Sequence, residues 1–475
     1  MNKKQVLERV LPEQAGVSSQ GILNFLDSVN DKRINLHSFM LLRHGKIAAE
    51  GYYRPFDGKL LHNVFSVSKS VTSAAVGIAI GEGLLSLADK VVDFFPEKLG
   101  KDVHKYTAMM TIEHLLAMAT VHTKSTNTRM DDWVEGFLNT PPDHAPGTIF
   151  AYDTTGTHTL CAIIQKVTGM TVHEYLKTRL FDPIGMGEIQ WESCPMNINK
   201  GGSGIKCTTE DLARFGQLYL QKGIWEGKQV LPEGWVERST ARHIDNSNTR
   251  MMLDGKNGYG YQFWRTRKNS YCAFGMGGQL VVVMPERDAV FVSTANTLLY
   301  RDGQQMLLDS MWEALYPAMA DGMLEKNELA YGQLKLRLDT LALVLPEGKN
   351  QSPTALRVSG QRFVLEKNPL EYDACEFTFE GLSPRLRFYK GEDWVDISFG
   401  MNRWTLGNEP FFGHRSASAA TWVDEKTCVV NIQIFDHLQM FILTCRFEEG
   451  YLVIHIQPVG VLSTEKVECH LNGSL

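Results

Sequence analysis

The chain has 475 residues, with 48 Lys and Arg against 54 Asp and Glu, and a net charge of −6 at pH 7. This mild negative balance argues against a nucleic-acid-binding protein, for which a strongly basic domain or stripe is expected. With 43% hydrophobic and 21% charged residues, the composition is that of a folded protein with ample apolar material for a core. The length allows two or three domains of about 150 residues, or one large and one small domain.

Neither a secretory signal nor a membrane-spanning segment is visible in the sequence. The first residues include two lysines but no apolar run behind them. The longest apolar candidate, residues 71–80, is far shorter than the ~18 residues that a bilayer requires. The eight cysteines are scattered without a C-x-x-C pair, a pattern typical of free, mostly buried thiols in a reducing compartment. We therefore expect a cytoplasmic protein with no membrane partner.

In chain order, the first predicted elements are a hairpin and a helix. Residues 38–53 alternate around His44 and Gly45, which predicts two paired strands. Residues 66–81 carry small and apolar side chains at helical spacing and end at a glycine, which predicts a deeply buried helix. Further helices are predicted over 112–119, 132–138, 157–168, 172–180 and 209–221. Strands over 259–265, 271–275, 279–284 and 289–296 and a closing helix over 302–316 follow.

These elements predict the division of the chain. Strands at both ends of the first ~320 residues, with helices between them, favour one mixed domain whose sheet is assembled from its two ends. Beyond it, alternating runs over 427–435, 440–447 and 451–456 predict strands. The fold class is therefore expected to be α+β, with a domain over 1–320 and an all-β accessory domain, a barrel or sandwich, over 321–475. The accessory domain is expected to pack on the first domain or to mediate self-association as a homo-oligomer.

Common catalytic motifs such as G-x-S-x-G, the Walker-type phosphate loop, H-E-x-x-H and G-x-G-x-x-G are absent from the sequence. What remains is S-x-x-K, which places a serine and a lysine on one helix face, so that the amine can reach the hydroxyl. The helix dipole also favours negative charge that develops on a serine at the N-terminus.

Three such tetrads begin at Ser66, Ser203 and Ser463, where chance alone would give about one. Ser203 lies in a glycine-rich G-G-S-G stretch, and Ser463 lies in a polar part of the accessory domain. Only Ser66 opens an apolar helix, in which Lys69 would be buried and its pKa lowered toward a value useful for proton abstraction. A serine in this position can also be a plain N-cap.

The histidines at 104, 114, 122, 144 and 158 show no ligand spacing, so neither a metal nor a cofactor is predicted. His114 is expected to cap or pack a helix.

Around Ser66, the run F-S-V-S-K-S-V-T-S at 65–73 resembles serine hydrolases related to class C β-lactamases and DD-peptidases. The similarity continues, in the family's order, through G-I-A-I-G-E-G-L-L-S-L-A-D-K-V-V-D-F-F-P-E at 77–97, T-I-E-H-L-L-A-M at 111–118, P-G-T-I-F-A-Y at 146–152, D-L-A-R-F-G-Q-L-Y-L at 211–220 and G-M-G-G-Q at 275–279. It covers about residues 40–300 and implies a β-lactamase/transpeptidase-like domain, in which an antiparallel sheet is flanked by helices and accompanied by an all-helical region.

The resemblance also implies roles for individual residues. Ser66 would be the acylated nucleophile and Lys69 its general base. Tyr152 stands where the family has the tyrosine of its second motif, which moves the proton to the leaving group, and Thr154 occupies the third position of that motif. Whether Lys69 or Tyr152 takes the first proton is left open, because such clusters titrate as a unit.

Residues 275–277 align with the family's third motif. The next backbone N–H, that of Gly278, would join that of Ser66 as the oxyanion hole, with Gln279 beside it as a substrate-binding residue. Penicillin-recognising members usually have a basic first residue in this motif and an Asn at the end of the second, whereas this chain has Gly275 and Thr154. Both departures disfavour strong β-lactam turnover. The G-x-G-G-Q form of the third motif resembles the branch of carboxylesterases and linear-amide hydrolases, such as those acting on 6-aminohexanoate oligomers.

The sequence thus predicts a serine hydrolase that cleaves a small ester or amide through an acyl-enzyme on Ser66. The alternatives are a non-catalytic penicillin-binding-like protein that keeps the pocket without turnover, and a DD-peptidase or β-lactamase.

Overall fold

The computed structural model describes residues 7–126, 130–249, 251–345, 347–379, 381, 384–460 and 468–475. The chain forms two compact units. The first unit comprises Met1–Gly51, Leu61–Ala295 and Asp302–Asp339, and the second comprises Tyr52–Leu60, Asn296–Arg301 and Thr340–Leu475. The expected division into domains over 1–320 and 321–475 stays a prediction.

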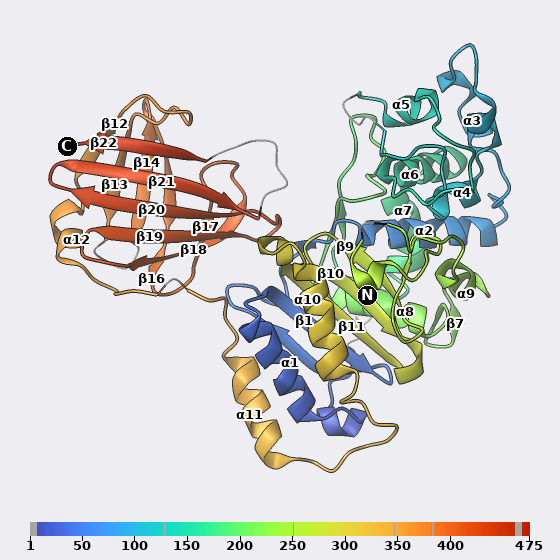
Figure 1. Ribbon diagram of the computed structural model, residues 1–475, viewed down its shortest axis with the longest axis horizontal. Coiled ribbons are helices and arrows are strands. Elements are labelled where there is room, and N and C mark those ends of the chain that lie inside the picture. Colours follow the sequence, from blue (N-terminus) through green and yellow to red (C-terminus); the bar gives the residue numbers. More distant parts are fainter. Residues whose placement is uncertain are drawn as a thin grey trace. The chain divides into compact units, whose positions relative to one another are not determined.

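A six-stranded sheet of the first unit is built from both ends of its sequence, as expected, in the order β2-β1-β11-β10-β9-β8 (Figure 1). The strands are β1 Asn35–Arg43, β2 Lys46–Tyr52, β8 Trp264–Arg265, β9 Tyr271–Gly275, β10 Gln279–Met284 and β11 Ala289–Asn296. The predicted hairpin over 38–53 is confirmed. Its turn residues His44 and Gly45 both have positive φ, as a tight two-residue turn between twisted strands requires.

Helices cover both faces of this sheet. Ser38 and Phe39 are neighbours on β1 and therefore point to opposite faces. Phe39 makes an edge-to-face contact at 5.3 Å with Phe25 of α1 (Ser19–Asp31), and the Ser38 hydroxyl lies 2.6 Å from that of Thr209 on α8 (Thr209–Leu220). The sheet is therefore the middle of three layers. The helices α10 (Gly303–Ser310) and α11 (Glu328–Asp339) contact α1.

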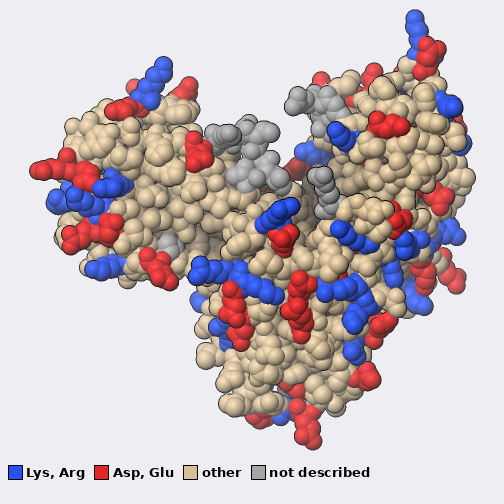
Figure 2. Space-filling view, in the orientation of Figure 1, with Lys and Arg blue, Asp and Glu red and all other residues tan. Residues whose placement is uncertain are grey.

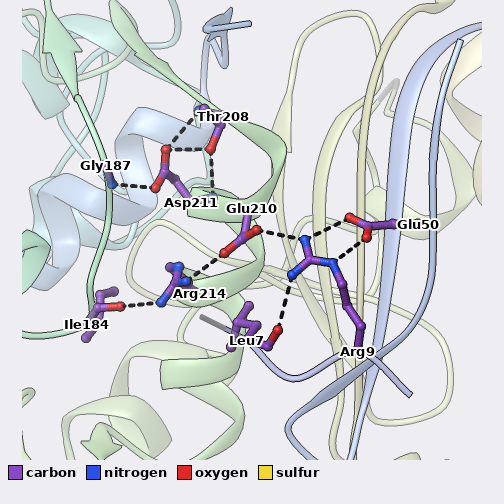
Figure 3. Close-up of polar contacts among 9 residues, drawn as sticks. All are labelled: Leu7, Arg9, Glu50, Ile184, Gly187, Thr208, Glu210, Asp211 and Arg214. Carbon is purple, nitrogen blue, oxygen red and sulfur yellow. Dashed lines mark hydrogen bonds and ion pairs between the residues drawn. The ribbon is translucent and has the colours of Figure 1, made fainter. Parts of the chain in front are cut away.

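Charged side chains fix the start of α8 (Figure 3). Thr208 and Asp211 form a capping box, in which the Asp211 carboxylate accepts from the Thr208 hydroxyl at 2.6 Å and from the Gly187 N–H at 2.7 Å. Glu210 accepts from Arg9 and from Arg214, the latter at 2.6 Å. These bonds hold the N-terminal segment, α8 and the 184–187 stretch together.

The helical region confirms the expected block between the strands, with shifted ends. Its helices are α2 Val67–Gly81, α3 Lys105–Met109, α4 Ile112–Leu116, α5 Trp133–Asn139, α6 Thr154–Thr168, α7 Val172–Leu176 and α9 Trp235–Thr240. The helix predicted over 172–180 divides into α7 and a π-helical turn, Lys177–Phe181. The closing helix divides in the same way into α10 and a π-helical turn, Met311–Leu315. His114 accepts from the Thr111 N–H at 3.0 Å and so caps α4, as expected.

The helix α2 lies in the centre of this region and contacts α6, α7 and the sheet. Every residue from Val67 to Ala79 is buried, which confirms the burial that its small side chains predicted. A Cβ at Gly77 would lie 2.3 Å from the Trp235 ring, so the glycine permits this packing. Short two- and three-residue strands flank the helices: β3 His62–Asn63, β4 Gln190–Trp191, β5 Ile205–Cys207, β6 Ile224–Trp225 and β7 Lys228–Gln229.

The segment 259–265 is the main departure from the predicted elements, because only its last two residues, Trp264 and Arg265, form a regular strand. The backbone N–H of Tyr261 donates to Ser239 and that of Gln262 to Leu116, so both point away from a strand partner. Apolar and aromatic composition alone could not reveal these bonds to distant backbone groups.

The second unit contains an eleven-stranded sheet that curves into a nearly closed barrel (Figure 1). The order is β15-β14-β13-β12-β22-β21-β20-β19-β18-β16, with β17 also paired to β18, and β15 contacts β17. The strands are β12 Arg362–Leu365, β13 Ala374–Thr378, β14 Arg385–Lys390, β15 Asp393–Ser398, β16 Gly400–Met401, β17 Thr405–Asn408, β18 Arg415–Trp422, β19 Thr427–Ile434, β20 Met440–Glu448, β21 Tyr451–Val459 and β22 Cys469–Ser474. One short helix, α12 (Pro353–Val358), precedes them.

Alternation in these strands places one set of side chains in an apolar core that includes Phe377, Trp422 and Phe447. The predicted sheet-rich C-terminal part with a barrel-like form is therefore confirmed.

All eight cysteines are buried and unpaired, as their spacing predicted. Acidic and basic side chains are interspersed on the face shown in Figure 2 rather than gathered by sign. Among the described residues, no helix combines the length and the apolar character that crossing a bilayer requires.

Candidate active site

Ser66 lies at the junction between the short strand β3 and α2. The preceding residue, Phe65, has φ 47°, a left-handed conformation that a bulky residue rarely adopts and that is frequent at functional sites. The Phe65 N–H donates to the Asn63 side chain at 3.0 Å, and the Val64 N–H donates to the Ile205 carbonyl at 2.9 Å. Ser66 occupies the N-cap position of α2, yet its hydroxyl makes no capping hydrogen bond. The plain N-cap interpretation therefore does not describe this hydroxyl.

Lys69 follows one helical turn later and is only 1% exposed. Its Nζ donates to Ser66 Oγ at 3.0 Å and to the Gly202 carbonyl at 2.7 Å. Burial disfavours the ammonium and lowers the pKa of Lys69 to about 7, against the opposing attraction of Asp153. A large fraction of the side chain is therefore neutral amine at neutral pH.

A glycine-rich loop supplies the carbonyl that contacts Lys69. A Cβ at Gly202 would lie 2.4 Å from Thr154 Cγ2 and 3.0 Å from Lys69 Nζ, so a larger residue would displace one of them. A Cβ at Gly201 would lie 2.6 Å from the Thr157 carbonyl. Two adjacent glycines thus let this backbone enter the site, a role that the sequence signalled only through the G-G-S-G composition.

Tyr152 approaches from the segment just before α6. Its ring centroid lies 4.7 Å from Lys69 Nζ. The ring stacks on Trp264 at 5.4 Å and meets Tyr259 edge to face at 6.5 Å. Burial raises the pKa of Tyr152 well above its ordinary value, and the influence of the nearby Ser66 hydroxyl offsets this only in part. The structure therefore brings Ser66, Lys69 and Tyr152 together.

Sequence reasoning missed Asp153, which stands between Tyr152 and Thr154. Its side chain is fully buried and accepts from the Thr155 N–H at 2.9 Å as the N-cap of α6. Desolvation raises the pKa of Asp153, while bonds from the first amides of α6 act in the opposite direction. In the sequence, the acidic residue directly after Tyr152 could have indicated this position.

Thr154, predicted to bind substrate, is the first residue of α6. Its N–H donates to Ser125 Oγ at 3.0 Å. Its methyl group packs against Gly202, where an added Cβ would lie 2.4 Å away. It therefore lies beside the loop that contacts Lys69.

Residues 276–278 form the turn between β9 and β10. A Cβ at Gly275 would lie 2.3 Å from the Val64 carbonyl, so this glycine brings the end of β9 against the residues that precede Ser66. Gly278 has φ 93°, and its carbonyl accepts from Ser293 Oγ at 2.9 Å.

Gln279 is 2% exposed and faces the protein interior. Its amide donates to the carbonyls of Met276 at 3.1 Å and Ala295 at 2.6 Å, and its side-chain oxygen accepts from the Ala295 N–H. The Gln279 side chain therefore links the 276–278 turn to β11.

The other two S-x-x-K tetrads differ in their setting. Ser203 lies in a loop, where its N–H donates to the Lys200 carbonyl at 3.1 Å, and Lys206 lies on β5 near Glu192. The tetrad at Ser463 falls outside the described residues. Within the described ranges, no group of three or more His, Cys, Asp or Glu side chains is arranged to hold a metal ion.

Sequence comparison finds relatives of this chain. The chain is 26% identical over 289 residues to the 6-aminohexanoate-dimer hydrolase of Paenarthrobacter ureafaciens. This match covers 54% of this chain and 72% of that protein. It is 23% identical over 189 residues to the beta-lactamase of Escherichia coli strain K12, covering 35% of this chain and 50% of that protein.

Solved structures show the same fold. A penicillin-binding protein homologue from Caulobacter crescentus matches 65% of this chain and 99% of its own, with a TM-score of 0.53 and 16% identity. The crystal structure of SurE matches 93% of this chain and 97% of its own, with a TM-score of 0.51 and 16% identity. The sequence profile of the beta-lactamase family matches residues 29–314, more than half of the chain. This protein is therefore a member of the beta-lactamase family.

Proposed function

We propose that the protein is a serine hydrolase that cleaves a small ester or linear amide through an acyl-enzyme on Ser66. One observation carries this proposal: a buried Lys69 amine with a pKa lowered to about 7 lies 3.0 Å from a serine hydroxyl that caps no helix. A serine hydroxyl becomes nucleophilic when such a base takes its proton.

Lys69 is the better candidate for the first base. In its neutral form the lone pair of Nζ accepts the Ser66 proton, whereas the raised pKa of Tyr152 keeps that phenol protonated. Tyr152 then acts as the acid: its phenol donates a proton to the leaving oxygen or nitrogen, and the phenolate that remains takes the proton that Lys69 accepted from Ser66. In deacylation the same groups activate water, which attacks the ester carbonyl of the acyl-enzyme and releases the acid.

The tetrahedral oxygen needs backbone donors that are already in place. We assign this role to the N–H groups of Ser66 and Gly278. Two facts support it: Ser66 is the N-cap residue of α2, and Gly275, which directly precedes the 276–278 turn, lies close to the backbone of Val64, two residues before Ser66.

The substrate class follows from what the site lacks. Gly275 and Thr154 stand where penicillin-recognising relatives usually have a basic residue, which helps hold the substrate carboxylate, and an Asn, whose amide contacts the substrate. A small ester or a short linear amide needs neither contact. The likeness to a relative named 6-aminohexanoate-dimer hydrolase supports the amide branch of this proposal.

The test is acylation of the full-length protein by a fluorophosphonate probe, with the adduct located by mass spectrometry. We expect stoichiometric labelling at Ser66, loss of labelling in Ser66→Ala, and retained labelling in Ser203→Ala. Hydrolysis of p-nitrophenyl esters and of the linear 6-aminohexanoate dimer should be lost only in the first variant. Labelling at Ser203, or ester hydrolysis that survives Ser66→Ala, would contradict the assignment.

The same experiment separates the alternatives. A protein that neither acylates nor turns over any ester or short amide would be a non-catalytic binding protein. Stoichiometric labelling by a fluorescent penicillin would instead favour a DD-peptidase or β-lactamase.

A further inference from the structure

Gln262 is a buried residue at the meeting point of the helices that carry the candidate site. It is 1% exposed and has φ 66°, a left-handed conformation that is uncommon for a residue other than glycine, Asn or Asp. Such a conformation persists only where surrounding contacts determine it, and it clusters at functional sites. Its own contacts show what holds it there.

The backbone carbonyl of Gln262 faces α2. It accepts a hydrogen bond from the Ser70 hydroxyl at 2.6 Å. Ser70 directly follows Lys69 and is itself buried. This bond therefore ties Gln262 to the helical turn that carries both Ser66 and Lys69.

The side-chain amide of Gln262 faces two other helices. Its Nε2 donates to the carbonyls of Leu115 at 3.0 Å and Leu116 at 2.8 Å, the last residues of α4. Its Oε1 accepts from the Thr157 hydroxyl at 2.9 Å, in the first turn of α6. The backbone N–H also donates to Leu116, at 3.0 Å. Both donors and the acceptor of the amide are thus engaged, each with a different backbone or side-chain group.

Two of these helices hold Tyr152. The helix α6 begins two residues after Tyr152. Met118, two residues after the end of α4, accepts a hydrogen bond from the Ala151 N–H at 2.9 Å. The Asp153 N–H also lies 3.2 Å from the Met118 sulfur. Tyr152 is therefore flanked on both sides by bonds to the segment that Gln262 caps.

We propose that Gln262 is a positioning residue that sets the separation between Ser66 and Lys69 on α2 and Tyr152 before α6. The inference rests on the serine-hydrolase function proposed above. Only an amide of this length meets the requirement, because it offers two donors to α4 and one acceptor to α6 on a single side chain. A carboxylate would lack the donors, and an apolar side chain would remove all three side-chain bonds and leave the buried Thr157 hydroxyl without this acceptor.

The test removes the links one at a time. Thr157→Val removes the hydrogen bond to the side-chain oxygen of Gln262, and Ser70→Ala removes the hydrogen bond to its backbone carbonyl. Gln262 itself is unchanged in both variants. Thr159→Val is a matched control on α6, because this buried hydroxyl donates to the Thr155 carbonyl of its own helix at 3.0 Å. Ser73→Ala is the matched control on α2, because this buried hydroxyl has no hydrogen-bond partner among the described residues.

For each folded variant, the rate constant of Ser66 acylation by the fluorophosphonate is measured against pH, together with kcat and KM for a p-nitrophenyl ester. We expect Thr157→Val and Ser70→Ala each to lower the acylation rate and kcat by about 10-fold, since displacements below 1 Å already weaken catalysis. KM should change by less than about twofold, because the substrate contacts remain. The acid limb of the Ser70→Ala profile should move to higher pH as Lys69 becomes less enclosed.

Coupling gives the sharper readout. If Gln262 links the two helices, the losses in Thr157→Val and Ser70→Ala should not multiply in the double variant, which should resemble either single variant. Gln262→Met, which keeps the side-chain length, should lose about 100-fold in kcat if it folds. The Thr159→Val and Ser73→Ala controls should stay within about twofold of the wild type.

The outcomes separate the two proposals. If the wild-type protein shows no acylation at Ser66, the proposed function fails. If the wild type acylates but Thr157→Val and Ser70→Ala match their controls in rate and pH profile, the positioning role of Gln262 is wrong. Equal losses in the link variants and their controls, tracking a lower melting temperature, would also overturn it.

Discussion

The side chains of Lys69 and Asp153 are 1% and 0% exposed and attract each other within one buried site. Burial disfavours the charged form of each, so it lowers the pKa of Lys69 and raises that of Asp153. Their mutual attraction works against burial and keeps the lysine pKa from falling further. The protonation of the candidate base is therefore set by two opposing effects, which can be separated by substitution.

The first prediction concerns the pH dependence of the wild-type enzyme. Lys69 can accept the Ser66 proton only as a neutral amine, and its pKa is lowered to about 7. We expect kcat/KM for an ester to rise about tenfold per pH unit below 7 and to level off above it. A stopped assay series from pH 5 to 9 measures this limb. A flat profile across pH 6–8 would exclude Lys69 as the titrating base.

The second prediction is that Asp153→Asn moves this acid limb to lower pH. The substitution removes the negative charge that favours the ammonium, so the pKa of Lys69 should fall. The amide oxygen of Asn can still accept from the Thr155 N–H, which preserves the cap of α6.

Asp143→Asn is the control for charge removal, because this exposed carboxylate bonds to Thr123. The acid limb of the kcat/KM profile of Asp143→Asn should coincide with that of the wild type. A shift to higher pH in Asp153→Asn would contradict the electrostatic role.

The third prediction is that Lys69→Met is inactive but more stable near neutral pH. The folded-state pKa of about 7 lies below the unfolded value of about 10.5, so the unfolded chain binds the proton more tightly between these limits. The contribution of Lys69 to wild-type stability therefore rises with pH from 7 to 10.5. Above pH 10.5 the lysine is neutral in both states, and burying it no longer costs a proton. Methionine carries no such cost, although the lost hydrogen bonds offset part of the gain.

We expect Lys69→Met to raise the free energy of unfolding by about 1–3 kcal/mol at pH 7 and by less at pH 9.5. Urea unfolding at the two pH values measures the difference. A stability gain that grows with pH would show that Lys69 is not buried in its neutral form.

Much of the fold and the core of the site follow from sequence patterns. The strands over 271–275, 279–284 and 289–296 were predicted with their observed limits because uninterrupted apolar runs lie between clear turns. The tetrad Ser66-x-x-Lys69 stood out because one helical turn fixes the distance between its two side chains.

What the sequence could not indicate depends on contacts between distant segments. Gly202 is one glycine among 41, and only its approach to Lys69 distinguishes it. Gln262 lies in an aromatic run typical of a strand, but its left-handed backbone and its bonds to three helices are properties of the folded chain. The substrate-binding role of Gln279 stays a prediction, and the bonds from its amide to Met276 and Ala295 are likewise contacts that only the folded chain reveals.

The last prediction concerns Gly275, which stands where penicillin-recognising relatives carry a basic residue. A Cβ here would lie 2.3 Å from the Val64 carbonyl and 2.8 Å from Gln279 Cβ, and neither atom is the flexible end of a side chain. Gly275→Ala should therefore displace the backbone that precedes Ser66, lowering stability by about 1–3 kcal/mol and kcat by about 100-fold. Gly275→Lys should lose activity in the same way and gain no hydrolysis of nitrocefin, because the site has no room for the side chain.

Gly332→Ala on α11 is the matched control, since nothing lies within 4 Å of the added Cβ. In a helix interior this change should raise stability by about 0.5–1 kcal/mol and leave kcat unaltered. Chemical unfolding and ester kinetics on the variants provide both measurements. If Gly275→Ala keeps wild-type kcat, the close approach to Val64 is not what positions Ser66, and the absence of a basic residue at 275 needs a different explanation from steric exclusion.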